Sequence, residues 1–251
     1  MPLKISLPRQ EIILEPVDLS EDAFRTFGVV IENPVPALIP SSQIEKLPAN
    51  AVQANQGTAL KYLDVTHMKD LYKNAPSGSS AKAVMNMFVC APRTLLKSAH
   101  AQISGMFPVE ILERHPYTTQ TFIPLGLSKS ETQQARYLVI VAPTLEPSPK
   151  DQCFSVPPRN SLGGQPPGRG LPDLTNVRAF LANGSQAVTY GPGTWHAPMA
   201  VVGKTPIDFV VVQFANGVGM EDCQEVELEN AVGGKLLVTI PAAKEAKRSR
   251  L

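Results

Sequence analysis

The chain has 251 residues, of which 43% are hydrophobic, and a formal net charge of only +1. This apolar content suffices for one large domain with a real core, and so small a charge argues against broad electrostatic binding of nucleic acid or of an anionic membrane. No apolar run approaches the roughly 18 residues that span a bilayer. The 24 prolines disfavour a helical bundle and favour short strands joined by turns.

The N-terminal part alternates short apolar runs with turn residues. We predict a strand over 12–14, a helix capped by Ser20 and stopped at Gly28, a strand over 29–31 and a loop over 33–48. These elements are short, which fits a β-rich fold.

The next part contains strands on both sides of a flexible segment. Residues 59–65 alternate as a half-buried strand does. Serine and glycine dominate the start of 77–83, which predicts a flexible connector. We expect strands over 84–90 and 99–103, paired with each other.

The stretch from Glu113 to Gln120 holds the first candidate site residues. In an extended strand alternate side chains share a face, so Glu113 and His115 point the same way and Arg114 points the other. A proline then ends the ladder, and the residues up to Thr119 suit a turn. A β-hairpin would bring Gln120 back beside Glu113 and His115.

The C-terminal half supplies the remaining strands and the last candidate. Residues 137–142 are the clearest buried strand, because the run is continuous and rich in β-branched side chains. Proline and glycine crowd 146–173, which we interpret as a surface excursion or a flap over the site. Further strands are predicted over 177–182, 186–190 and 208–214. His196 follows a Gly-Pro-Gly turn.

Four candidates could form one site: Glu113, His115, Gln120 and His196. Two histidines with a glutamate and a glutamine suit a borderline or hard divalent ion such as nickel, manganese, iron or zinc. Whether a metal is bound stays open, and we expect no organic cofactor.

The spacing of these four residues resembles the two split motifs of the cupin superfamily. Glu113 stands at the first His position of that pattern, His115 at the second, Gln120 at the Glu position and His196 at the distant His. Ala200 stands where the distant motif ends in Asn. The resemblance implies an all-β fold, a cupin-type double-stranded β-helix barrel with a few short helices.

Longer segments carry a second and more specific resemblance. They are Asn55-x-Gly57, Lys61-Tyr62, residues 112–116, Gln120-x-Phe122-Ile123-Pro124, residues 178–180, Asn183-Gly184-x-Gln186, Tyr190, Trp195-His196-x-Pro198 and Asp222-Cys223. In this order they resemble the ureidoglycolate lyase family of the fungal type. The similarity covers nearly the whole chain apart from the proline-rich insertions.

This family resemblance implies a carbon–nitrogen lyase that splits (S)-ureidoglycolate into glyoxylate and urea in allantoin and purine catabolism. It implies a homodimer, with Asn55 and Lys61 at the substrate. Tyr190 is a further substrate-binding candidate, because it lies an even number of residues before His196 and would share its side of an extended chain. The reaction needs one group to remove the hydroxyl proton and another to protonate the leaving urea nitrogen. We expect Glu113 or His115 in the first role and His196 in the second, with Gln120 orienting the substrate.

Two other interpretations stay open. Another metal-dependent cupin enzyme, an oxygenase or an isomerase, would use the same ligands. A non-enzymatic cupin would bind a small acid without converting it. Polar residues gathered in the mouth of a barrel argue against a pure scaffold, because burying them costs free energy.

The cysteines and the two ends of the chain predict its location. Three cysteines without a CxxC pair and a start without an apolar signal predict an intracellular, reducing compartment. Residues 1–241 are predicted to form one domain and 242–251 a disordered, charged tail. The tail ends in Ser249-Arg250-Leu251, a variant of the Ser-Lys-Leu peroxisomal address, so we expect a peroxisomal location, or otherwise a cytoplasmic one.

Overall fold

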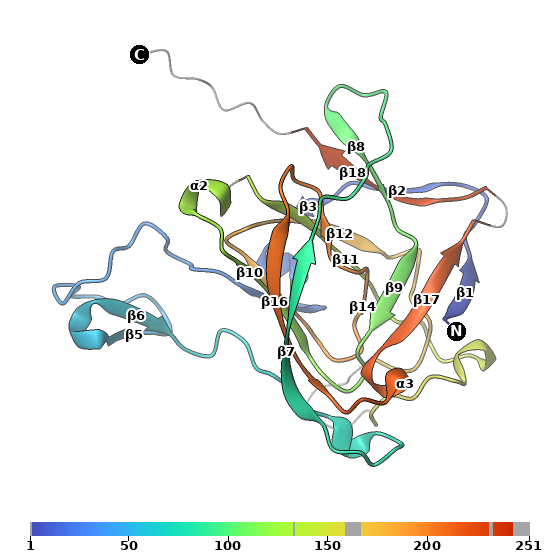
Figure 1. The fold of residues 1–251 in the computed structure, drawn as a ribbon, viewed down its shortest axis with the longest axis horizontal. Helices are drawn as coiled ribbons and strands as arrows, with labels where there is room; N and C mark the ends of the chain where they lie inside the picture. The colour runs from blue at the N-terminus through green and yellow to red at the C-terminus, as the bar shows by residue number, and fades with distance from the viewer. Residues whose placement is uncertain (1, 133, 159–166, 231–232, 243–251) are drawn as a thin grey trace.

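The computed structural model describes residues 2–132, 134–158, 167–230 and 233–242 (Figure 1). Short strands dominate this part of the chain and form four sheets. The α-helices are single turns: α1 (Glu21–Phe24), α2 (Lys129–Thr132) and α3 (Gly219–Asp222). The predicted all-β class is confirmed.

The largest sheet has eight strands. Its spatial order is β1 (Leu3–Ser6), β17 (Gln224–Glu229), β9 (Ile111–Arg114), β14 (Trp195–His196), β11 (Arg136–Ala142), β12 (Arg178–Asn183) and β3 (Val17–Asp18), and β15 (Ala200–Val201) also pairs with β11. The pairs β1–β17 and β12–β3 are parallel and the others are antiparallel.

The second sheet has five antiparallel strands in the order β4 (Gly28–Ile31), β13 (Ala187–Tyr190), β10 (Gln120–Leu125), β16 (Ile207–Ala215) and β7 (Lys82–Cys90). A third sheet contains β2 (Ile12–Leu14), β18 (Leu236–Pro241) and β8 (Ile103–Pro108). The last sheet is a hairpin of β5 (Ala51–Ala54) and β6 (Ala59–Tyr62).

Two hydrophobic cores hold these layers together. The eight-stranded and five-stranded sheets enclose the first core, with Phe122, Tyr137, Val139, Phe180 and Phe209 buried inside. The other face of the eight-stranded sheet and the three-stranded sheet share the second core, which includes Leu112, Ile140, Trp195, Val226 and Val238.

Strand β11 shows why its sequence is apolar throughout. Tyr137 and Val139 enter the first core, whereas Leu138 and Ile140 enter the second. Because side chains alternate across a strand, a strand between two cores needs apolar residues at every position. The buried strand predicted over 137–142 is confirmed.

The expected hairpin between Glu113 and Gln120 is wrong. Strand β9 pairs with β17 and β14 in one sheet, whereas β10 pairs with β13 and β16 in the other. Residues 115–119 therefore carry the chain across the barrel from sheet to sheet. Proline and threonine favour a turn at this place, but they do not select the partner of the strand that follows.

Some predicted strands and ends also differ. Strand β7 pairs with β16 rather than with residues 99–103, and β8 begins at Ile103 and pairs with β18. Helix α1 stops at Phe24, because the chain must turn to bring Gly28 against β13. A Cβ atom at Gly28 would lie 1.9 Å from the carbonyl oxygen of Thr189, so only glycine allows this approach.

The expected connector over 77–83 has defined contacts at both ends. The backbone N–H and the hydroxyl of Ser77 each donate a hydrogen bond of 2.7 Å to the carboxylate of Glu221, and β7 already begins at Lys82. The tail beyond Ala242, including its predicted peroxisomal address, lies outside the described residues. Within the described ranges, no helix is long and apolar enough to cross a membrane.

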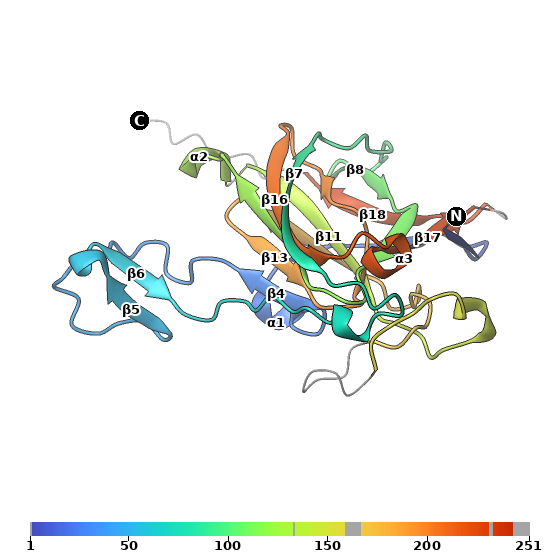
Figure 2. The same ribbon diagram turned by 60° about the horizontal axis from the view of Figure 1, so that its bottom comes forward.

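The β5–β6 hairpin lies at the end of an extended arm, which we define as residues 33–65. Figures 1 and 2 both show the arm projecting away from the stacked sheets. Its hydrogen bonds are internal: the N–H of Leu63, for example, donates to the carbonyl of Asn50. The arm therefore adds little to either core.

Candidate active site

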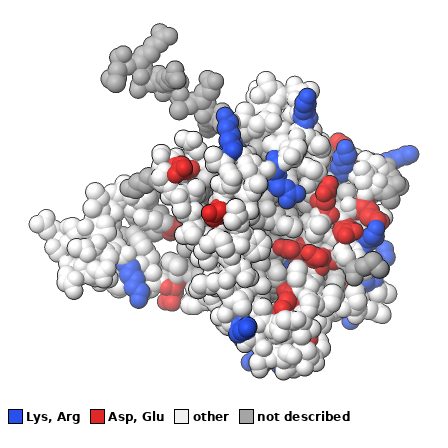
Figure 3. Space-filling view, in the orientation of Figure 1, with Lys and Arg blue, Asp and Glu red and all other residues white. Residues whose placement is uncertain are grey.

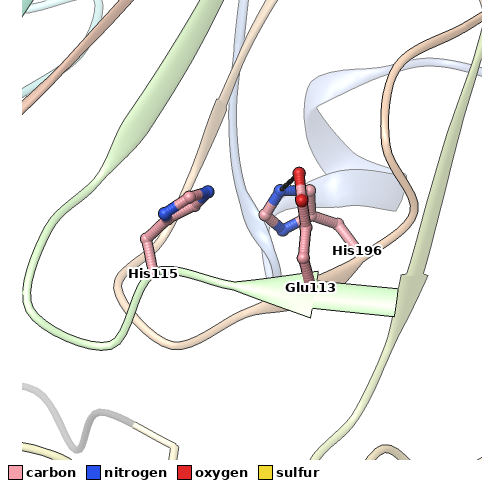
Figure 4. A group of neighbouring side chains, drawn as sticks. All are labelled: Glu113, His115 and His196. Carbon is pink, nitrogen blue, oxygen red and sulfur yellow. Dashed lines mark ion pairs between the residues drawn. The ribbon is translucent and has the colours of Figure 1, made fainter. Parts of the chain in front are cut away.

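Three predicted site residues meet at one end of the barrel. The possible ligand atoms of Glu113, His115 and His196 all lie within 4.8 Å of one another (Figure 4). Glu113 and His196 are register partners in β9 and β14, and His115 lies two residues beyond Glu113 on the same side. We call these three residues the Glu113 cluster.

The ring of His115 is held by one backbone bond. Its Nδ1 lies 2.6 Å from the carbonyl oxygen of Asp222, and because a carbonyl only accepts, Nδ1 carries the proton and donates it. Nε2 therefore presents a lone pair, and it is buried with no hydrogen-bond partner among the described residues. This is an unusual state for a buried polar atom.

His196 is held in the same way. Its Nδ1 donates to the carbonyl oxygen of Thr194 over 2.9 Å, and its ring stacks on Tyr190 at 4.0 Å between centroids and 10° between planes. Its Nε2 lies 3.2 Å from Oε1 of Gln120 and 3.5 Å from Oε1 of Glu113. Both neighbours are acceptors, so Nε2 needs a proton or a cation to satisfy them.

Gln120 joins the cluster from the opposite sheet. Its Nε2 donates to Oε1 of Gln213 over 2.8 Å, and this contact turns Oε1 of Gln120 toward His196. The sequence did not single out Gln213. The available signal was a polar residue within β16, a strand that is otherwise almost entirely apolar.

Burial and charge set the protonation states of the cluster. Burial alone would raise the pKa of Glu113, but His196 and His115 lower it below its usual value of 4.5. Burial and the neighbouring His196 lower the pKa of His115 to about 4. Near neutral pH, Glu113 is therefore a carboxylate and His115 a neutral imidazole.

The donor set fits a divalent metal ion. Both histidines donate Nδ1–H to a backbone carbonyl and turn Nε2 toward the carboxylate of Glu113. A histidine that binds a metal through one ring nitrogen usually donates the N–H of the other nitrogen in this way. The unpartnered Nε2 of His115 is the atom that such an ion would satisfy. Two imidazoles and a carboxylate do not by themselves distinguish nickel, manganese, iron and zinc.

The predicted substrate-binding residues lie in two different places. Tyr190 lies beneath His196, and its hydroxyl is buried without a partner in the described part of the chain. Asn55 and Lys61 lie on the arm, and one chain does not bring them to the Glu113 cluster. Their predicted roles stay predictions.

Further groups around the cluster were not assigned roles from the sequence. Cys223 and Glu225 offer ligand atoms within 4.8 Å of Glu113 and of each other. Burial raises the pKa of the Cys223 thiol, so it stays protonated. Asp222 and Thr194 contribute only backbone carbonyls, for which residue type gives no signal.

Arg114 and Trp195 lie behind the cluster, on the other face of the sheet. The guanidinium of Arg114 lies 4.3 Å from the centroid of the Trp195 ring and donates to Gln224 and to the carbonyls of residues 168–170. The excursion predicted over 146–173 is thus tied to this outer face by its described residues. Trp195 packs in the second core, away from the site.

Comparison with known proteins gives consistent matches. The family model described as ureidoglycolate lyase matches residues 11–233. A ureidoglycolate lyase of Schizosaccharomyces pombe is 34% identical over 215 residues, which cover 85% of this chain and 91% of that protein. The ureidoglycolate lyase of Saccharomyces cerevisiae is 33% identical, and the match covers 77% of this chain and 82% of that protein. A ureidoglycolate lyase of Burkholderia mallei is 29% identical, and the match covers 77% of this chain and 78% of that protein.

A solved structure of Lactobacillus farciminis oxalate decarboxylase in complex with formate is 14% identical, covering 64% of this chain and 30% of that chain at a TM-score of 0.26. A likeness this weak carries no argument. The family model, by contrast, matches most of the chain, and relatives above 30% identity align along most of their length. The chain belongs to the ureidoglycolate lyase family.

Proposed function

We propose that this protein cleaves (S)-ureidoglycolate into glyoxylate and urea in the catabolism of allantoin. The observation that carries the proposal is the contact of 3.5 Å between Glu113 and His196 inside a chain of this family. It pairs a proton acceptor with a proton donor, and the reaction needs one of each.

The chemistry is an elimination with two proton movements. The hydroxyl on the central carbon loses its proton, the carbon–oxygen double bond of glyoxylate forms, and the carbon–nitrogen bond to urea breaks. The departing nitrogen must gain a proton, because an anionic urea is a poor leaving group.

The protonation states suggest a role for each group. Glu113 is ionised and His115 is neutral, so either can take the hydroxyl proton. His196 can hold a proton on Nε2 between Glu113 and Gln120, and it is the group that would protonate the leaving nitrogen. The Oε1 atom of Gln120 would orient the hydroxyl or the urea. Each role would contribute about 10² to 10⁴ in rate.

When Glu113 is the base, Glu113 and His196 also restore each other's protonation state after the reaction. After one turnover Glu113 holds the proton and His196 has lost one. Direct transfer across the contact between Oε1 and Nε2 returns both to their starting states. No net proton is taken up or released, which agrees with the balanced reaction.

A divalent ion held by Glu113, His115 and His196 would act as a Lewis acid on the substrate's oxygens. It would occupy the same Nε2 of His196 that otherwise carries the proton. We therefore propose that removing or adding a divalent ion changes the activity, and experiment will identify the ion.

We also propose that the protein works as a homodimer. Strand β7 ends the five-stranded sheet, and its side chains are mostly exposed although most are apolar. Exposed apolar edge strands invite pairing with another chain.

The test is release of urea and glyoxylate from racemic ureidoglycolate by the purified protein, before and after exhaustive chelation. We expect equal amounts of the two products from half of the racemate. Release that survives chelation supports side-chain acid–base catalysis, and loss that one divalent ion restores supports a metal site.

Absence of both products with every metal refutes the proposed lyase activity. Oxygen consumption without urea would then favour another cupin enzyme. Glyoxylate binding without turnover would favour a small-acid-binding protein.

A further inference from the structure

The side-chain amide of Gln213 is used at one end only. Its Oε1 accepts a hydrogen bond of 2.8 Å from Nε2 of Gln120, whereas no hydrogen bond engages its own Nε2 among the described residues. Gln213 is half-buried in β16, and the positions on the same face before it, Val211 and Phe209, are buried and apolar. A free N–H₂ group beside the Glu113 cluster is available to bind a ligand.

The order of donors and acceptors decides which end of Gln213 is free. His196 donates Nδ1–H to the carbonyl of Thr194, and its Nε2 lies 3.2 Å from Oε1 of Gln120. When Nε2 holds the proton that the proposed function requires, Gln120 accepts with its oxygen and therefore donates its N–H₂ to the oxygen of Gln213. Gln213 then ends the chain with an N–H₂ group. Because successive hydrogen bonds polarise one another, this group is a stronger donor than an isolated amide.

The inner face of the five-stranded sheet is open to solvent next to Gln213. On β7, which pairs with β16, the residues that share this face include Asn86, which is exposed, and Phe88, which is 43% exposed. The ring of Phe88 nevertheless contacts the core ring of Phe122, with 5.7 Å between centroids, so these side chains face the inside of the barrel. Figure 3 shows mostly uncharged surface over β7, which suits a neutral group of a ligand.

The carboxamide of Gln120 spans the gap from His196 to Gln213. Its oxygen faces Nε2 of His196 and its nitrogen binds Oε1 of Gln213. A ureido group contains the same O–C–N unit as a carboxamide, with similar bond lengths. A ureido group that lies beside Gln120, with its nitrogen at Nε2 of His196, therefore brings its carbonyl oxygen to Nε2 of Gln213.

That carbonyl oxygen gains negative charge during the proposed reaction. When the carbon–nitrogen bond breaks, its electron pair passes to the nitrogen and is delocalised onto the carbonyl oxygen of the departing urea. His196 supplies the proton that completes the urea. A donor already in place at the oxygen stabilises this charge more in the transition state than in the bound substrate, as an oxyanion hole does.

We propose that Gln213 is a further catalytic residue, whose Nε2–H binds the carbonyl oxygen of the ureido group of the substrate. The inference rests on the proposed function and deepens it, because it names the residue that recognises the leaving group. Ligands with a carbonyl oxygen at this place bind, and ligands with an N–H group there are rejected, since two donors would face each other.

The selectivity of binding tests the inference without turnover. N-carbamoylglycine has the ureido group and the carboxylate of the substrate but no hydroxyl, so it cannot undergo the elimination. Guanidinoacetate carries an N–H₂ group in place of the carbonyl oxygen. By calorimetry, the wild type should bind N-carbamoylglycine at least ~10-fold more tightly than guanidinoacetate, and Gln213→Glu should reverse this order, because a carboxylate accepts from both Gln120 and a guanidinium. A wild type without this preference, or a Gln213→Glu variant that keeps it, overturns the inference.

Two further variants control for charge and for folding. Asn86→Asp adds the same charge to the same face of the barrel, from the neighbouring strand, and should keep the wild-type order of the two ligands. Equal reversal in Asn86→Asp and Gln213→Glu would show a long-range attraction of the guanidinium and refute the contact. Gln213→Met removes the donor without adding charge and should weaken N-carbamoylglycine binding ~3- to 10-fold; unchanged affinity would refute the contact even where Gln213→Glu does not fold.

Turnover separates the donor from the support of Gln120. Gln213→Glu keeps an oxygen for Gln120 but has no N–H, so kcat for urea release should fall ~10²- to 10³-fold, with thermal unfolding as the control for folding. A wild-type kcat in this variant shows that Gln213 only orients Gln120, and refutes the catalytic role. If the wild type releases no urea but the ligand order still reverses, the proposed function fails and the recognition of a ureido group by Gln213 stands.

Discussion

Replacing Glu113 by glutamine removes a charge and keeps the shape of the side chain. If Glu113 and His196 are both charged, their separation of 3.5 Å and an effective dielectric constant of about 20 give about 5 kcal/mol of attraction before desolvation is counted. Glu113→Gln leaves the charge of His196 without its partner, so we expect it to lower stability by about 3 kcal/mol or more. His196→Ala in the same chain should restore part of that loss.

Catalysis gives the sharper comparison. Each residue alone contributes ~10² to 10⁴ in rate, so independent roles would cost the double variant ~10⁴ to 10⁸. In the proposed cycle the two residues exchange one proton and work as a unit. We therefore expect the double variant to be no slower than the slower single variant.

The assay is kcat for urea release at saturating substrate, with glyoxylate measured in parallel and thermal unfolding as the control for folding. The temperature must lie below the unfolding transition of the least stable variant. Effects that multiply in the double variant would show that Glu113 and His196 act independently, and the proton-return step would be refuted.

Three further predictions follow from the same geometry. In metal-free protein the free energy of unfolding should fall by ~3 kcal/mol between pH 6.5 and 4, because burial lowers the pKa of His115 to about 4 and only the unfolded chain gains a proton in that window. Urea titration of His115→Asn should lack this decrease, and an unchanged pH dependence would contradict the assignment. Arg114→Met should lower stability by about 3 to 5 kcal/mol in the same assay, since it leaves buried carbonyls without a donor; a loss below 1 kcal/mol would contradict this. Gly28→Ala should destabilise strongly because its Cβ would overlap a carbonyl oxygen, whereas Gly219→Ala, with open space around it, should be tolerated; similar melting temperatures for the two would refute the argument.

The sequence predicted which side of a strand a side chain occupies, and whether it is buried, better than it predicted which strands pair with each other. Alternation placed Glu113 and His115 on one side of a strand and Arg114 on the other, and β9 has this arrangement. This succeeded because the period of two follows from backbone geometry alone. The buried run over 137–142 was recognisable for the same reason.

Strand pairing depends on residues far away in the sequence. Gln120 was expected near the histidines through a hairpin, and it does contact His196, but from the opposite sheet. Local turn residues could not show this, because the partners of β10 come from β13 and β16. The backbone carbonyl that orients His115 lies at Asp222, and no side-chain pattern predicts a carbonyl contact.

The pairing of the two ends of the chain has a consequence for its synthesis. Strands β1 and β2 are made first, yet their partners are β17 and β18, at the opposite end. Parallel pairing over so long a separation closes slowly. While the ribosome still holds the C-terminal part, the first strands must wait with unpaired edges, and His115 lacks the carbonyl that orients it. A nascent chain therefore has no complete site until Asp222 and strand β17 have left the ribosome.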